Sequence, residues 1–225
     1  MSFIFEEKTS LSPFVETIWH TYSENGGSFI SLAASQWEIV VTKQASKITL
    51  TVRGPETKAR MAPIPEYAEF FGIIFKLGTF MPHLPAKILV DREINLPEGA
   101  HNSFWLNSSV WQFPTFENAD VFIDRLVRSE ILVCEPVVEA AIQGQLKDIS
   151  LRSIQRRFRK ATGLTYKAVS QIERARQALV LLQQGETILD TVYQTGYFDQ
   201  PHLTKSLKYL TGQTPAQIAR LRQPA

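Results

Sequence analysis

The chain has 225 residues, of which 44% are hydrophobic, and its formal net charge at pH 7 is +2. This length allows two domains with sizeable cores, and a single cysteine, Cys134, excludes an internal disulfide. No apolar run approaches a membrane span, low-complexity segments are absent, and the first ten residues lack the apolar run of a signal peptide, so we expect a cytoplasmic protein without membrane association.

The first half of the chain is predicted to be mainly β-structure between residues 28 and 113. Strand-forming residues fill positions 37–42, and residues 48–53 alternate between apolar and polar. A short turn at residues 44–46 would join these two strands in a hairpin. Further strands are predicted at residues 69–76, 88–90 and 93–96, and a Pro-rich loop at residues 78–85. Several short strands at close spacing indicate a small barrel or sandwich.

Aromatic residues of this region are candidates for an effector site, because the mouth of a barrel can hold a small molecule. The candidate effector-binding residues are Trp19, Trp37, Phe71, Phe75 and Trp105. The alternative is that these side chains belong to the hydrophobic core.

Metal and catalytic sites are not indicated by the sequence. The histidines His20, His83 and His101 are scattered and lack the spacing of metal ligands. We find no phosphate-binding loop, nucleophile elbow or paired catalytic acids. The sequence therefore predicts no metal, no cofactor and no enzyme activity.

A helix is predicted at residues 116–127. Its apolar residues recur at helical spacing and form one stripe. The stripe consists of Phe116, Ala119, Phe122, Ile123, Leu126 and Val127. This stripe could pack on the β-rich region or on the same helix of a second subunit, so a homodimer is one alternative.

The second half of the chain is basic, whereas the first half is acidic. Residues 1–130 contain 11 Lys and Arg against 15 Asp and Glu, a net charge of −4. Residues 131–225 contain 13 Lys and Arg against 7 Asp and Glu, a net charge of +6. A basic region of this kind is expected in a nucleic-acid-binding domain.

A repeat lies within the basic half. Residues 150–165 and 199–214 match with an offset of 49. Both copies begin with an N-cap residue, Ser150 or Asp199, and both contain a Thr-Gly pair that stops a helix, Thr162-Gly163 or Thr211-Gly212. The predicted exposed faces, which are our candidate DNA-binding residues, carry Arg152, Ser153, Gln155, Arg156 and Arg159 in the first copy and Gln200, His202, Thr204, Lys205 and Lys208 in the second.

These side chains are suited to the major groove of duplex DNA. Arginine can pair with guanine, glutamine with adenine, and lysine with phosphate. The alternative is a solvated helix surface that binds nothing. Because the same polar layout occurs twice, we favour double-stranded DNA as the partner.

Further helices surround the two copies. They are predicted at residues 136–143, 166–184, 188–195 and 215–221. The helix at residues 166–184 would span about 28 Å at 1.5 Å per residue. This length is close to the ~34 Å between successive major grooves on one face of B-DNA.

Residues from about 136 to 222 resemble the AraC/XylS family of transcriptional regulators. The matching residues are Ser150, Ile154, Gln155-Arg156-Arg157-Phe158, Thr162-Gly163, Arg174-Ala175, Leu179, Ile188, Gly196-Tyr197, Asp199-Gln200, Lys208, Gly212 and Thr214-Pro215. The resemblance implies two helix-turn-helix units joined by a helix, a cupin-like β-barrel sensor in front of them, and RNA polymerase as a further partner. The base-contacting positions of the family fall on Arg152, Gln155, Arg156, Gln200, Thr204 and Lys205.

The sequence departs from the family pattern in three places. Residues 144–149 make a longer connection before Ser150 than the family has. Val192 stands where a small alanine is usual. In the second copy Pro201 replaces a small residue, and Leu203 and Leu207 replace aromatic residues.

The predicted fold class is α+β, with an N-terminal β-rich barrel or sandwich followed by an all-α domain whose two helix-turn-helix units are joined by a long helix. The predicted domains are a sensor or dimerisation domain at 1–115, a helical linker at 116–135 and a DNA-binding domain at 136–225. The predicted function is a sequence-specific DNA-binding transcription regulator that responds to an unidentified small-molecule effector. The alternatives are a non-catalytic interaction module and a cupin-type enzyme with a DNA-binding appendage.

Overall fold

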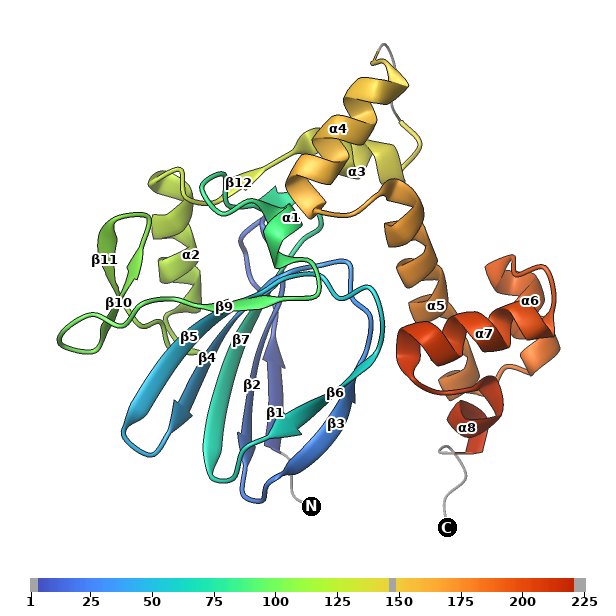
Figure 1. Ribbon diagram of the computed structural model, residues 1–225, viewed down its shortest axis with the longest axis horizontal. Coiled ribbons are helices and arrows are strands. Elements are labelled where there is room, and N and C mark those ends of the chain that lie inside the picture. Colours follow the sequence, from blue (N-terminus) through green and yellow to red (C-terminus); the bar gives the residue numbers. More distant parts are fainter. Residues whose placement is uncertain (1–3, 146–148, 221–225) are drawn as a thin grey trace. The chain divides into compact units, whose positions relative to one another are not determined.

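The first half of the chain is rich in β-strands and the second half is helical, which confirms the predicted α+β fold class (Figure 1). The computed structural model describes residues 4–145 and 149–220. Its internal contacts group the chain into two compact units. One unit contains Met1–Gly27, Gln36–Pro55 and Pro63–Thr165, and the other contains Ser28–Ser35, Glu56–Ala62 and Tyr166–Ala225. The functional division at residues 115 and 135 remains a prediction.

Six antiparallel strands form the main sheet of the first unit (Figure 1). In spatial order they are β1 (Ile4–Lys8), β2 (Val15–Ser23), β7 (Ala68–Phe75), β4 (Glu38–Gln44), β5 (Lys47–Arg53) and β9 (Glu93–Asn95). The strands predicted at residues 37–42, 48–53, 69–76 and 93–96 are therefore confirmed. Gln44 pairs with Lys47, so β4 and β5 form the predicted hairpin with its turn at residues 45–46.

Shorter strand pairs complete the β-structure of the described residues. They are β3 (Gly27–Ser31) with β6 (Arg60–Ile64), β8 (Thr79–Phe80) with β12 (Val133–Cys134), and β10 (Ser103–Leu106) with β11 (Ser109–Gln112). The strand predicted at residues 88–90 is wrong, because these residues lie in or beside the short helix α1 (Ala86–Leu89). The helix buries Ala86 and Leu89, which are three residues apart, and this spacing is helical rather than alternating.

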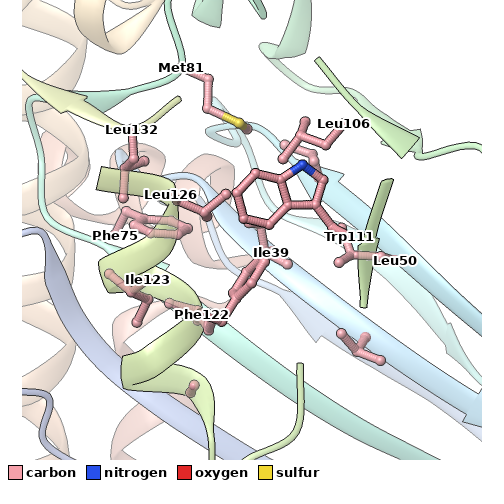
Figure 2. Packing of buried hydrophobic residues seen from close by; sticks show 14 of the residues in the cluster. Ile39, Leu50, Phe75, Met81, Leu106, Trp111, Phe122, Ile123, Leu126 and Leu132 are labelled. Carbon is pink, nitrogen blue, oxygen red and sulfur yellow. The ribbon is translucent and has the colours of Figure 1, made fainter. Parts of the chain in front are cut away.

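The helix predicted at residues 116–127 is α2 (Ala119–Arg128), and it contributes to the core of the first unit. Figure 2 shows Phe122, Ile123 and Leu126 of this helix among the buried side chains of the strands. Leu126 and Ile123 have no solvent exposure. The apolar stripe therefore packs on the β-rich region, the first of the two predicted alternatives.

The predicted helices of the second half are present. Their bounds are α3 (Pro136–Ile142), α4 (Leu151–Thr162), α5 (Tyr166–Gln184), α6 (Ile188–Thr195), α7 (Gln200–Thr211) and α8 (Pro215–Arg220). Leu221, the predicted last residue of the closing helix, and residues 146–148 of the longer connection lie outside the described residues. Of the helices that the structure describes, none is both long and apolar enough to cross a membrane.

Candidate nucleic-acid interface

The helix α4 is defined by local signals at both ends. Its N-cap Ser150 accepts a hydrogen bond from the backbone N–H of Ser153 at 3.3 Å, which satisfies one donor of the first turn. At the other end Gly163 adopts a φ of 74°, a conformation that favours glycine. The helix buries Phe158, Ala161 and Thr162, so its opposite face is left for solvent.

Four candidate residues are exposed on α4. They are Arg152, Gln155, Arg156 and Arg159. None of the three arginines among them forms an ion pair within the described part of the chain. Ser153 is only partly exposed, and its Oγ accepts a hydrogen bond from the Ser150 hydroxyl at 3.0 Å, so it belongs to the cap.

The neighbouring Arg157 has a structural contact instead. Its guanidinium lies 3.6 Å from a carboxylate oxygen of Glu135. Glu135 in turn caps α3, because its side chain accepts from the backbone N–H of Val137 at 3.3 Å. Arg157 therefore links α4 to the N-terminus of α3, and the carboxylate of Glu135 partly compensates its positive charge.

The helix α7 repeats this design. Its N-cap Asp199 accepts from the backbone N–H of His202 at 2.7 Å, and Pro201 lies in the first turn, where a missing N–H costs little. Gly212 ends the helix with a φ of 74°. The buried face consists of Leu203, Leu207, Leu210 and Thr211.

An open hollow lies on the exposed face of α7. It is lined by Gln200, Pro201, Thr204, Lys205, Lys208 and Thr214. The structure therefore brings four of the five candidates of the second copy onto one surface. Thr214 was not predicted to lie on this surface. It forms a capping box with Gln217, because the backbone N–H of each residue donates to the side chain of the other, at 2.9 and 3.3 Å. The Thr-x-x-Gln pattern of this box was the available sequence signal.

Two candidates on α7 also make local contacts. The Nδ1 of His202 accepts from the backbone N–H of Phe198 at 3.5 Å, so the imidazole is tied to the turn before the helix. The ammonium of Lys208 donates to the carbonyl oxygen of Gly212 at 3.2 Å. Both side chains remain exposed.

A buried tyrosine connects the turn of the second helix-turn-helix unit to its neighbours. The hydroxyl of Tyr197 lies 2.8 Å from Oγ of Ser206, and its ring meets His202 edge-on with centroids 5.1 Å apart. The guanidinium of Arg174 lies 5.6 Å from the ring centroid. Burial raises the pKa of Tyr197, against the opposing effects of Ser206 and Arg174, so the phenol stays protonated at neutral pH.

Removing the cap of α7 should cost stability. We expect Asp199→Ala to lower the free energy of unfolding by about 1 kcal/mol, because the N–H of His202 loses its acceptor. Urea unfolding measures the change. The matched control is Asp124→Ala, which removes only an exposed ion pair with Arg128 at 3.3 Å and should stay within about 0.5 kcal/mol. Equal effects of the two substitutions would contradict the capping role.

The predicted effector residues lie in different surroundings. Trp37, Phe71 and Phe75 are buried in the core, and the indole N–H of Trp37 donates to the carbonyl oxygen of Thr79 at 2.6 Å. The indole N–H of Trp19 donates to Glu38 at 3.3 Å, and Trp105 is 45% exposed on β10. The hollow beside Trp37 has a volume of about 10 Å³, which is room for roughly one water.

Metal ligands do not gather in the part of the chain that the structure describes. In residues 4–145 and 149–220, no three His, Cys, Asp or Glu side chains are placed so that they could hold a metal ion.

Comparison with solved structures gives similarity to ToxT from Vibrio cholerae. ToxT from strain O395 has 9% identity and a TM-score of 0.40 over 98% of this chain and 99% of that chain. An apo ToxT variant from strain SCE256 has 8% identity and a TM-score of 0.43 over 96% and 100%. ToxT bound to (E)-4-(8-methylnaphthalen-1-yl)but-3-enoic acid has 10% identity and a TM-score of 0.39 over 97% and 99%. These values are too low to transfer any property.

Sequence comparison matches part of the second half of the chain to a known domain family. Curated protein sequences gave no match. The model of the family described as "Helix-turn-helix domain" matches residues 147–221, about a third of the chain. The matched range contains α4 to α8, including both capped helices of the repeat. Residues 147–221 therefore match a helix-turn-helix domain, in agreement with the two helix-turn-helix units predicted from the sequence.

Proposed function

We propose that the protein is a sequence-specific DNA-binding transcription regulator that inserts α4 and α7 into the major groove of duplex DNA. One observation carries this proposal: the helix-turn-helix domain exposes two helices with equivalent caps and with polar faces of Arg, Gln, Thr and Lys. In helix-turn-helix proteins the second helix of each unit lies in the major groove. The net charge of +6 on residues 131–225 complements the phosphates.

The proposed roles differ between base edges and phosphates. Base contacts are assigned to Arg152, Gln155 and Arg156 of α4 and to Gln200 and Thr204 of α7, whereas Lys205 of α7 would contact phosphate. Arg159 and Lys208 lie further along the same exposed faces, where they would contact phosphate. Ser153 and His202 lie in the first turns of α4 and α7, where they hydrogen-bond to the N-cap residues. We propose that these two residues contact the phosphate backbone of the DNA and that their neighbours contact the bases.

The connection between the two recognition helices is consistent with two adjacent binding elements. The helix α5 has 19 residues and therefore spans about 28 Å. Successive major grooves on one face of B-DNA are ~34 Å apart. We propose that the DNA site contains two elements separated by about one helical turn.

The β-rich first half is proposed to regulate the DNA-binding half. This regulation would use a small-molecule effector bound among the five candidate aromatics, or self-association of the first half. A small-molecule effector and RNA polymerase remain proposed partners. The protein would act in the cytoplasm, where a regulator meets DNA.

Salt dependence distinguishes this function from the alternatives. We expect the full-length protein to bind duplex DNA with an affinity that falls steeply as salt rises, as measured by fluorescence anisotropy. A pure interaction module would show no duplex binding at low salt. A stoichiometric metal in the purified protein, together with no duplex binding, would favour the cupin-type enzyme.

Lys205 should act as a point charge. We expect Lys205→Ala to weaken binding to all duplexes to a similar extent and to lower the slope of log affinity against log salt by about one unit. The control is Lys47→Ala in the turn between β4 and β5, which removes the same charge far along the sequence and should leave the slope unchanged. A change in base preference for Lys205→Ala, at constant slope, would show instead that Lys205 contacts a base.

A further inference from the structure

The C-terminal end of α7 is completed by backbone groups from the first half of the chain. The N–H of Ala33 donates to the carbonyl oxygen of Leu210 at 2.8 Å. The N–H of Ala59 donates to the carbonyl oxygen of Tyr209 at 3.0 Å. The last four carbonyls of an α-helix have no partner inside the helix, so these two bonds satisfy acceptors that α7 itself cannot.

The two segments that supply these donors are joined to each other. Ala34 and Glu56 exchange two backbone hydrogen bonds, at 3.0 and 2.9 Å. The hydroxyl of Ser35 also donates to the carboxylate of Glu173 on α5. Ser28–Ser35 and Glu56–Ala62 belong to the same compact unit as α5 to α8. The compact unit that contains the second helix-turn-helix is therefore built from three separate stretches of the chain.

Side-chain packing at Gly212 adds a steric constraint. A Cβ atom at this position would lie 3.0 Å from Cγ2 of Ile30 and 3.5 Å from Cβ of Ala59. Ala33 is 2% exposed, so its backbone N–H is shielded from competing water. The end of α7 is thus closely fitted to both segments.

The same contact leaves the DNA-binding face of α7 open. The two hydrogen bonds and the close approach fall on Tyr209, Leu210 and Gly212, at the C-terminal end. The proposed base contacts begin at the other end, where Gln200 is exposed. Capping and the proposed base contacts therefore use different parts of the helix.

We propose that Ser28–Ser35 and Glu56–Ala62 position α7 for base recognition and stay bound to it on DNA. This inference rests on the proposed DNA-binding function. Ala33 and Ala59 are then positioning residues, since they act on DNA only through α7. Recognition of the DNA element under α7 depends on these segments, whereas recognition of the element under α4 does not.

Two glycines with the same local role provide a matched test in the full-length protein. Gly212 ends α7 and Gly196 ends α6, both with positive φ, and asparagine tolerates this conformation. A Cβ at Gly196 would have no neighbour within 4 Å. On a duplex selected with the wild-type protein, we expect Gly212→Asn to reduce affinity about tenfold and Gly196→Asn to have little effect.

The location of the loss and its rescue separate positioning from general destabilisation. Footprinting of Gly212→Asn should show lost protection at one of the two elements only. Adding Ile30→Ala, which removes the crowding methyl groups, should restore protection and affinity. Equal affinities of Gly212→Asn and Gly196→Asn, or uniform loss without rescue, would overturn the positioning role alone. No duplex binding by the wild-type protein would overturn the proposed function, and this inference with it.

A second measurement uses the unmodified protein. We expect the amides of Ala33 and Ala59 to resist hydrogen exchange, observed by NMR, both without DNA and with saturating selected duplex. Protection in both states supports a cap that persists on DNA. Loss of protection at these two amides on adding the duplex would overturn it, whatever the variants show.

Discussion

Phe75→Ala is expected to lower the free energy of unfolding by about 3–5 kcal/mol, the largest effect among the substitutions considered. Phe75 is fully buried among the side chains of the core (Figure 2), and its ring stacks on Trp37 with centroids 4.1 Å apart. Removing the ring would leave a cavity in the core around β4, β7 and α2. Urea denaturation of the full-length protein measures the difference.

The control for Phe75 is another aromatic residue of the same sheet. Phe5 on β1 is 57% exposed and stacks on Trp19 at a longer centroid distance of 6.3 Å, so Phe5→Ala should cost less than about 1 kcal/mol. If Phe75→Ala costs no more than Phe5→Ala, the assignment of Phe75 to the packed core is contradicted, and its interpretation as an effector-binding residue is favoured.

Arg156→Ala is expected to weaken binding to the selected duplex by about 1–3 kcal/mol and to relax the preference at one base pair. The guanidinium is exposed on α4, and it forms no ion pair in the described part of the chain. Its planar fork suits a guanine edge, whereas the ammonium of Lys205 is a point charge. We therefore predict that α4 supplies more base discrimination and α7 more anchoring to phosphate.

The adjacent arginine is the matched control. Arg157→Ala removes the same charge from the same helix. Unlike that of Arg156, however, the guanidinium of Arg157 lies 3.6 Å from the carboxylate of Glu135. We expect Arg157→Ala to leave the base preference unchanged. If Arg156→Ala also preserves specificity while Lys205→Ala abolishes it, the assignment is reversed and α7 is the principal recognition helix.

The helical half could be predicted closely because its signals are local. Ser150 and Asp199 cap α4 and α7 as predicted, and a glycine follows each helix. The span of α5 agrees residue for residue with residues 166–184. Capping and helical periodicity act within one or two turns, so a sequence window contains the whole signal.

The β-rich half was less accessible from the sequence, because its structure depends on distant pairings. The apolar run at residues 88–90 suggested a strand, but packing of Ala86 and Leu89 makes this segment helical. Among the aromatics predicted to bind an effector, Trp37, Phe71 and Phe75 are buried and Trp105 is 45% exposed, a difference that composition cannot reveal. The cap on α7 joins residues that are more than 140 positions apart, and alanine backbone groups carry no sequence signal.

Selection of bound sequences from a random duplex pool, with the purified full-length protein, tests the central claim most directly. We expect enrichment of a site with two sequence elements about one helical turn apart, near 10 base pairs between their centres. We also expect Arg156→Ala to degrade the consensus in one element and to leave the other intact. A pool that shows no enriched sequence over successive rounds would contradict DNA recognition by α4 and α7, and a consensus that Arg156→Ala leaves unchanged would contradict base recognition by α4.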